Sequence, residues 1–189
     1  MKKVIALPAY NAEKTIRKTI DSIPDKNEYR IILVDDCSKD NTFEIAKSLG
    51  IESYRTPRNL GYGGNQKLCY EKALEKNPEI IILLHPDCQY EPRIVPLMCK
   101  LIEYGICDVV LGNRIRTRKE ALEGGMPFYK YVSNRFLTVI ENVIAGQNLG
   151  EWHSGLMAYS AKVLKTINWR DNSDDFVFDT QILFQCVNA

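Results

Sequence analysis

Five consecutive aliphatic residues at positions 80–84 give way abruptly to a polar run from His85 to Gln89. A segment that is apolar at every position, rather than at alternate ones, is typical of a strand buried on both faces of a sheet. Other apolar segments flank it, and the pattern predicts strands at 3–7, 29–34, 51–55, 80–84, 107–111 and 156–159. Helical spacing and capping residues predict helices at 11–21, 40–49, 65–77, 92–103, 128–145 and 161–166, and a last one that begins near 179.

Strands and helices alternate through about the first 110 residues, which predicts an α/β fold with a parallel sheet and crossover helices. The first strand is expected to end before Pro8, because proline lacks the amide that a ladder needs. Residues 117–125 are polar and contain glycine, so we expect a mobile loop there. The last predicted helix is still in progress at Ala189, and we expect a single domain that is truncated at this end.

Composition and charge argue against several classes of protein. The formal net charge of the 189 residues is +1, which argues against a general nucleic-acid-binding protein. No apolar stretch approaches the length of a transmembrane helix, and the N-terminus is predicted to be a strand rather than a signal peptide. The six cysteines form no CxxC pair, and scattered thiols fit a reducing compartment. We therefore expect a soluble cytoplasmic protein.

Polar or acidic residues follow three of the predicted strands, at 8–11, 35–36 and 85–87. The carboxyl ends of parallel strands share one edge, where open α/β sheets bind ligands. Tyr10 could stack on a flat base, and Asp35 or Asp36 could accept a hydrogen bond from a base N–H or a ribose hydroxyl. Two alternatives stay open: the aspartates could cap a helix, and Tyr10 could be a packing residue.

The third of these exits carries His85, Asp87 and Gln89 at alternate positions. Alternate residues of an extended segment point the same way, so an imidazole, a carboxylate and an amide could converge on one cation or one polar ligand. Asp87 could hold Mg²⁺ or Mn²⁺ against phosphate oxygens. The alternative is a polar loop that merely follows a buried strand.

The segments at 7–11, 34–42 and 59–61 and the exit at Asp87 occur in the same order as in glycosyltransferase family 2, which this chain resembles over nearly its whole length. Segments 112–114 and 154–159 resemble the dolichol-phosphate mannose synthase branch of that family. The resemblance implies the GT-A fold, a Rossmann-like three-layer α/β/α nucleotide-diphospho-sugar transferase with a mostly parallel central sheet. It also implies a nucleotide-sugar-binding half at 1–115 and an acceptor-side half at 116–189.

The resemblance assigns Pro8, Tyr10 and Asp35 or Asp36 to the nucleobase and ribose, and we add Gly63 of the glycine-rich turn to this nucleotide site.

The resemblance also makes Asp87 and Gln89 ligands of a divalent cation, Mn²⁺ or Mg²⁺. His85 stands where the family has the first acid of its Asp-x-Asp motif. A histidine there would favour a transition ion such as Mn²⁺ if it binds the metal. It could instead contact a ribose or phosphate of the nucleotide, or be a loop residue only.

On the acceptor side, Arg114 and Lys130 match basic residues that this branch keeps for the acceptor's phosphate, and we assign Ser154 to the same site. Met157 replaces an arginine common in the branch. Asp179 aligns with an acid that could serve as general base, although a helix N-cap is an equally good reading of it.

The prediction is a metal-dependent, inverting glycosyltransferase with Arg114 and Asp179 as its catalytic candidates. Its donor would be a UDP- or GDP-sugar and its acceptor a polyprenyl phosphate met peripherally at the inner face of a membrane, as in glycolipid or cell-envelope biosynthesis. A saccharide or protein hydroxyl with Asp179 as base is the alternative acceptor.

Two other classes are weighed against this one. A nucleotidyltransferase would need a glycine-rich, basic loop after the first strand, where this chain has Tyr10 and Asn11. A non-catalytic module that binds a nucleotide sugar stays open because of His85, Met157 and the position at which the chain ends.

Overall fold

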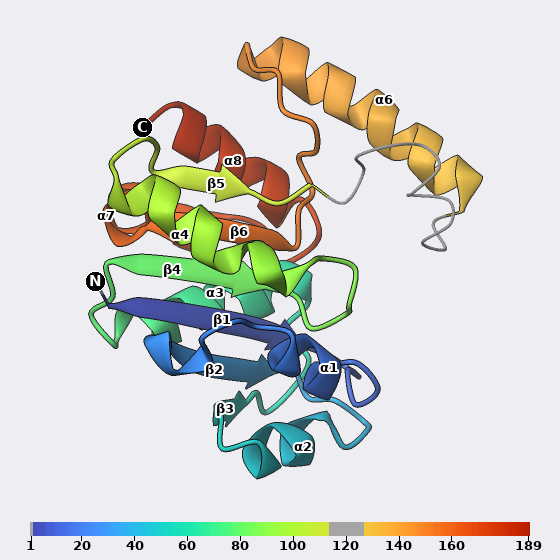
Figure 1. Ribbon diagram of the computed structural model, residues 1–189. Coiled ribbons are helices and arrows are strands. Elements are labelled where there is room, and N and C mark those ends of the chain that lie inside the picture. The colour runs from blue at the N-terminus through green and yellow to red at the C-terminus, as the bar shows by residue number, and fades with distance from the viewer. Residues whose placement is uncertain (1, 114–126) are drawn as a thin grey trace.

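The computed structural model, which describes residues 2–113 and 127–189, confirms the alternation of strands and helices that the hydrophobic pattern predicts (Figure 1). Its strands are β1 (Lys3–Ala9), β2 (Tyr29–Asp35), β3 (Glu52–Arg55), β4 (Ile80–Leu84), β5 (Val109–Leu111) and β6 (Leu156–Ser160). Its helices are α1 (Ile16–Asp21), α2 (Thr42–Ser48), α3 (Tyr62–Leu74), α4 (Val95–Glu103), α6 (Phe128–Ala145), α7 (Ala161–Thr166) and α8 (Phe178–Val187).

The six strands form one sheet in the order β3-β2-β1-β4-β6-β5. The first four strands in this order are parallel, whereas β6 runs antiparallel to both of its neighbours. The carboxyl ends of β1, β2 and β4 therefore lie at one edge together with the amino end of β6. The sheet is mostly parallel, as predicted, and the direction of β6 is what brings the later part of the chain to that edge.

Helices cover both faces of the sheet, and β4 at its centre is buried throughout. Ile80, Ile82 and Leu84 pack in a cluster with residues of α1 and α4, which lie in front of the sheet in Figure 1. Ile81 and Leu83 pack on the other face with residues of α3 and α8. Side chains alternate across a strand, so burial on both faces requires an aliphatic residue at every position of β4.

The prediction that the first strand ends before Pro8 is wrong, because β1 continues through Pro8 to Ala9 beside β2. The Ala9 carbonyl accepts a hydrogen bond from Asp36 N and so faces β2. The backbone of Pro8 then faces the β4 side, where the pairing stops at Ala6. A missing amide costs no ladder hydrogen bond at that position.

The ends of several helices differ from the prediction. The first helix begins at Ile16 instead of position 11, because Ala12 and Thr15 form a turn ahead of it. Helix α3 begins at Tyr62, within the glycine-rich turn. Helices α6 and α7 have the predicted bounds. The loop expected at 117–125 lies outside the described residues.

Helix α6 lies apart from the sheet in Figure 1, and many of its large apolar side chains are exposed. Phe136 is 65% exposed and Val143 is 78% exposed. In the part of the chain that the structure describes, no helix is both long and apolar enough to cross a membrane.

The ion pair of Lys3 with Glu103 joins the start of the sheet to the end of α4, at 2.8 Å. Hydrogen bonds from Lys100 and Lys3 lower the pKa of Glu103 to about 2. The stabilisation from a carboxylate with a lowered pKa is complete above its unfolded value of 4.5 and is lost as the pH falls towards 2.

We expect Glu103→Gln to lower the free energy of unfolding at pH 7, and the difference from the parent chain to shrink as the pH falls from 4.5 towards 2. Urea denaturation at several pH values measures both effects. Glu44→Gln, at an exposed position of α2, is the control and should leave the pH dependence unchanged. A difference that grows in acid would contradict the assignment.

Candidate functional site

The site lies where the strand order changes direction. From β1 the chain continues to β2 on one side of it, while β4 pairs on the other side. Open α/β sheets bind ligands in the crevice outside the carboxyl ends of strands at such a switch point. The exits of β1 and β4 therefore define the position at which a ligand is expected.

Three residues at these exits have a left-handed backbone although none is glycine. They are Asn11 after β1 (φ 51°), Cys37 after β2 (φ 58°) and Cys88 after β4 (φ 61°). Such conformations are uncommon for residues with a side chain, and they cluster at ligand sites. Their occurrence at three neighbouring strand ends marks this edge of the sheet as the functional one.

Side chains of the second exit hold the first one in place. Asn11 N donates to Ser38 Oγ at 2.8 Å, and Ala12 N donates to Thr42 Oγ1 at 2.7 Å. Asp40 accepts a hydrogen bond from Thr42 N at 3.0 Å. Burial acts to raise the pKa of Asp40, but the hydrogen bonds from Thr42 and from the amide of Glu13 outweigh it, so the pKa is lowered. The polar residues of segment 38–42 thus have an architectural use that the sequence analysis did not assign.

The Asp36 carboxylate is buried and holds the segment at 59–61. It accepts hydrogen bonds from Leu60 N at 2.7 Å, from Gly61 N at 3.2 Å and from Thr56 Oγ1 at 3.1 Å. Three donors thus converge on one buried carboxylate. Asp36 therefore fixes the positions of Thr56 and of residues 60–61 at the edge of the sheet where a ligand is expected.

Asp35 is buried as well and faces a different group. Its Oδ2 lies 3.2 Å from Arg55 Nε, and Ser38 N donates to its carboxylate at 3.3 Å. Pro8 is buried within β1, whereas Tyr10 is 49% exposed just beyond it. Of these predicted nucleotide contacts, Tyr10 is the side chain that a ligand in the crevice could reach without rearrangement of the protein.

Gly63 has a packing function in the structure. Its amide donates to the Asp174 carbonyl at 2.8 Å, and a Cβ atom on it would lie 2.5 Å from the Ser173 carbonyl oxygen. The N-terminus of α3 is therefore closed by the segment that precedes α8, and its Gly63 amide points at protein. The assignment of Gly63 to the nucleotide finds no support in these contacts.

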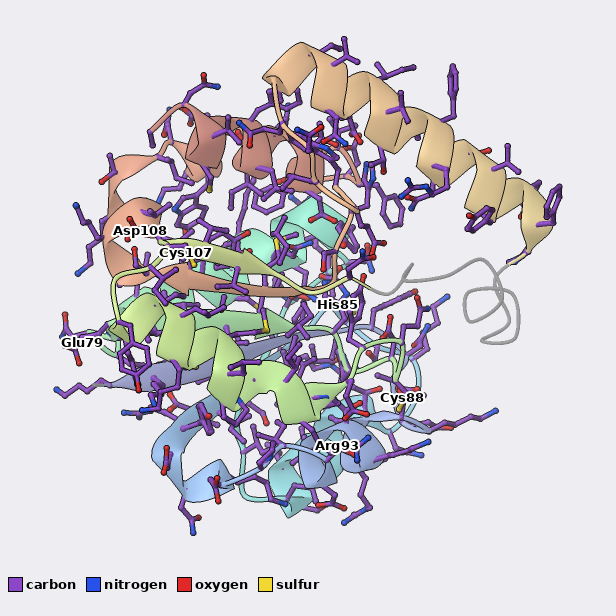
Figure 2. The ribbon with its side chains drawn as sticks, turned by 45° about the horizontal axis from the view of Figure 1, so that its top comes forward. Glu79, His85, Cys88, Arg93, Cys107 and Asp108 are labelled. Carbon is purple, nitrogen blue, oxygen red and sulfur yellow. The ribbon has the colours of Figure 1, made fainter. Side chains whose placement is uncertain are left out.

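A cavity of about 350 Å³ adjoins the exit of β4. We call it the β4 cavity; it is lined by Tyr62, His85, Asp87, Tyr90, Ser133, Asn134, Leu137, His153, Gly155, Phe176 and Asp179. Figure 2 shows His85 and Cys88 on the side of the molecule where β4 ends, away from Glu79, Cys107 and Asp108. Residues from β4, α6 and α8, far apart in sequence, thus come together around one space.

His85 forms part of the wall of the β4 cavity and packs closely against the start of β6. Its backbone amide donates to the Gly155 carbonyl at 2.8 Å, and its ring centroid lies 5.2 Å from that of Tyr62. A Cβ atom on Gly155 would lie 2.9 Å from Tyr90 Cε2 and 3.0 Å from His85 Cγ. The glycine at 155 is therefore required for His85 and Tyr90 to approach the strand.

Asp87 and Gln89 are both exposed after the end of β4, and of the two only Asp87 lines the cavity. Asp87 Oδ1 accepts a hydrogen bond from Gln89 N at 2.9 Å. Across 2–113 and 127–189 there is no group of three or more His, Cys, Asp or Glu side chains placed to hold a metal ion. Mg²⁺ is often held by one or two carboxylates together with substrate phosphates. The residues present fit a cation of that kind, one that arrives with a diphosphate, and not a preformed protein cage.

Asp179 lies in the first turn of α8 and is buried. Tyr62 donates to its Oδ2 at 2.7 Å, and Gln66 Nε2 donates to its Oδ1 at 2.9 Å. Burial and the nearby Asp179 raise the pKa of Tyr62, so the tyrosine remains a hydrogen-bond donor. Both oxygens of Asp179 are thus engaged by side chains of α3.

Of the remaining predicted site residues, the structure describes the side chain of Ser154 but not those of Arg114 and Lys130. Ser154 is fully buried and donates to the Gly112 carbonyl at 2.6 Å, which joins the exit of β5 to the start of β6. This contact supports a positioning function for Ser154 more than direct contact with a ligand. Arg114 and the side chain of Lys130 lie outside the described part of the structure, so their roles stay predictions.

The sequence analysis missed His153 and Glu141. His153 lines the β4 cavity, and Glu141 Oε1 of α6 lies 3.5 Å from its Nε2. Glu141 could have been noticed in the sequence because it is a charged residue in an otherwise apolar stretch of α6. Its partner could not be identified, because the two residues meet only in the folded chain.

Comparison with known proteins identifies the family. The model of glycosyl transferase family 2 matches residues 4–167. A UDP-N-acetylglucosamine–dolichyl-phosphate N-acetylglucosaminyltransferase of Methanococcus voltae is 31% identical over 181 residues, which is 87% of this chain and 71% of that protein. A dolichol-phosphate mannosyltransferase of Pyrococcus furiosus is 25% identical over 138 residues, 69% of this chain and 37% of that protein.

Among solved structures, glucosyl-3-phosphoglycerate synthase of Mycobacterium tuberculosis superposes with a TM-score of 0.70 at 21% identity. The superposition covers 96% of this chain and 64% of that structure, so the chain spans a little under two thirds of its length. At this identity the likeness concerns the fold, which is the one predicted.

Asp36→Ala leaves the amides of Leu60 and Gly61 and the Thr56 hydroxyl without their shared acceptor. We expect a loss of about 3 kcal/mol in the free energy of unfolding, because buried donors are left unsatisfied. Urea denaturation measures it, with Glu44→Ala as the control. A loss within 0.5 kcal/mol of the control would show that Asp36 does not hold this segment.

Proposed function

Because this chain belongs to glycosyl transferase family 2, we propose that it moves a sugar from a nucleotide-diphosphate sugar to a polyprenyl phosphate, with inversion at the anomeric carbon. The observation that carries the proposal is the β4 cavity, which opens beside Asp87 at the switch point of the sheet. A donor at the exits of β1 and β4 would lie next to an acceptor in this cavity. The names of the dolichyl-phosphate and dolichol-phosphate relatives support the class of acceptor.

We assign donor recognition to the first half of the chain, 1–115, and acceptor recognition to 116–189. Tyr10 is exposed where it can stack on the base. Asp35 and Asp36 act chiefly by holding the surrounding segments, since their carboxylates already accept hydrogen bonds from the protein. UDP or GDP is the nucleotide that we expect.

Asp87 and Gln89 would hold a divalent cation, Mn²⁺ or Mg²⁺, against the diphosphate of the donor. When bound, the cation supplies positive charge to the leaving diphosphate. His85, with its ring against Tyr62, borders both this position and the β4 cavity. It therefore separates the donor side from the acceptor side and can contact either ligand.

The contacts of Asp179 favour a phosphate acceptor over a hydroxyl. A hydroxyl needs a base to remove its proton in the transition state, and Asp179 is the acid that would serve. Its oxygens already accept hydrogen bonds from Tyr62 and Gln66, so a hydroxyl of the acceptor would have to compete with both of these donors. A phosphate oxygen is already anionic and needs no base, so Asp179 would only order the wall of the cavity.

A polyprenyl acceptor resides in a membrane, so we propose that the chain meets the inner face of that membrane peripherally. The exposed apolar residues of α6, among them Phe136 and Val143, lie on the helix that also contributes to the β4 cavity. Arg114 and Lys130 are our proposed phosphate contacts from the sequence resemblance.

We expect one nucleoside diphosphate among UDP, GDP, TDP and CDP to stabilise the chain in the presence of Mn²⁺ or Mg²⁺. A ligand at a hundredfold its Kd adds about 2.7 kcal/mol, which raises the Tm of a chain of this length by roughly 5 to 10 °C. A thermal-shift panel with and without each metal measures the effect.

Asp87→Ala should abolish the metal-dependent part of this shift, whereas Asp21→Ala, an exposed acid at the end of α1, should retain it. If none of the four nucleotides shifts the Tm of the folded chain, the glycosyltransferase proposal fails for this chain. A shift without turnover on any acceptor would favour the non-catalytic module.

A further inference from the structure

Glu141 is a buried carboxylate that is only partly satisfied. It is 8% exposed on α6, and its Oε1 accepts a hydrogen bond from Thr180 Oγ1 of α8 at 2.8 Å. Its Oε2 is also buried and has no hydrogen-bond partner among the described residues. A buried acid in this position costs stability unless a donor or a positive charge accompanies it.

His153 is the group that accompanies it. The Nε2 atom of His153 lies 3.5 Å from Glu141 Oε1 and 3.2 Å from Thr180 Oγ1. The three side chains come from α6, from the segment before β6 and from α8, so they join three separate parts of the chain. Their arrangement fixes which way the imidazole ring of His153 faces.

Further hydrogen bonds position the segment that carries His153. The side-chain amide of Asn142, next to Glu141 on α6, donates to the Leu149 carbonyl and accepts from the Leu149 amide, each at 2.9 Å. Trp152 Nε1 donates to Asn142 Oδ1 at 2.8 Å, and Arg135 donates to the Gly150 carbonyl at 2.9 Å. Polar side chains of α6 therefore fix the position of residues 149–153 beside the β4 cavity.

The charges around the cavity give His153 its significance. The described residues that line it include no lysine or arginine, and its acids are Asp87 and Asp179. Met157 lies fully buried in β6 and supplies no charge. An anionic group in this cavity needs a donor on the acceptor side, and an imidazole can supply one.

We infer that His153 contacts the phosphate group of the acceptor, and that Glu141 and Thr180 are positioning residues that orient its ring. This inference rests on the proposed function, because it concerns the phosphate of the proposed acceptor. It adds a recognition residue, on the segment before β6, to those that the sequence resemblance implies. Glu141 touches no ligand and acts only through His153.

Calorimetric titration of farnesyl phosphate, a short soluble probe, into the full chain saturated with its nucleoside diphosphate and metal tests this inference. We expect His153→Phe, which keeps an aromatic ring without a donor, to weaken binding of the probe about tenfold to a hundredfold. His153→Arg should restore much of the affinity. Nucleoside diphosphate binding should change little in either variant, whereas the Tm of the ligand-free chain should fall in His153→Phe, because the buried Glu141 loses its partner.

Glu141→Gln should weaken the binding of farnesyl phosphate several-fold in the parent chain and have no effect in the His153→Arg variant, because it acts through the histidine ring. This non-additivity distinguishes a positioning residue from a general loss of stability. Glu44→Gln on α2 is the matched control and should leave both affinities unchanged.

Farnesyl phosphate that binds His153→Phe as tightly as it binds the parent chain would overturn the inference. So would an equal loss of affinity for farnesyl phosphate and for farnesol, which would indicate that His153 only shapes the cavity. Absence of nucleotide binding in the parent chain, with phosphate binding still dependent on His153, would overturn the proposed function and leave the inference standing.

Discussion

The central constraint on this fold is that β4 is covered on both faces and paired on both edges. All five of its side chains are buried, and β1 and β6 occupy its two sides. A strand with no contact to water cannot carry polar residues, so its first polar groups occur where it leaves the sheet. His85 and Asp87 lie at that point because the strand can place them nowhere else.

The exits of β1 and β2 obey the same constraint and are further fixed by hydrogen bonds between them. Asn11 and Ser38 link the two exits directly, and Asp36 carries the next segment through Leu60. Several polar residues near the site are thus architectural. They hold left-handed turns at strand ends in place, and the exposed ring of Tyr10 projects from this rigid frame.

Much of the fold could be predicted from the sequence, and much less of the site. Uniformly apolar runs such as 80–84 have one structural explanation, and α6 and α7 have the predicted bounds. Pro8 was misjudged because the cost of a missing amide depends on which neighbouring strand it faces. The packing of Gly63 could not be predicted, because sequence does not reveal that its amide donates to the Asp174 carbonyl. His153 and Glu141 are 12 positions apart and meet only through tertiary packing.

The antiparallel direction of β6 has a consequence for which parts of the site can be altered independently by substitution. Residues on the proposed donor side leave the sheet from β1, β2 and β4, whereas His153 and Gly155 reach the same edge on a segment that enters it. The two sides are therefore built from separate stretches of backbone that share one strand boundary. Under the proposed function, substitutions within α6 and residues 149–153 would change the acceptor side of the β4 cavity without changing the backbone of the β1, β2 and β4 exits.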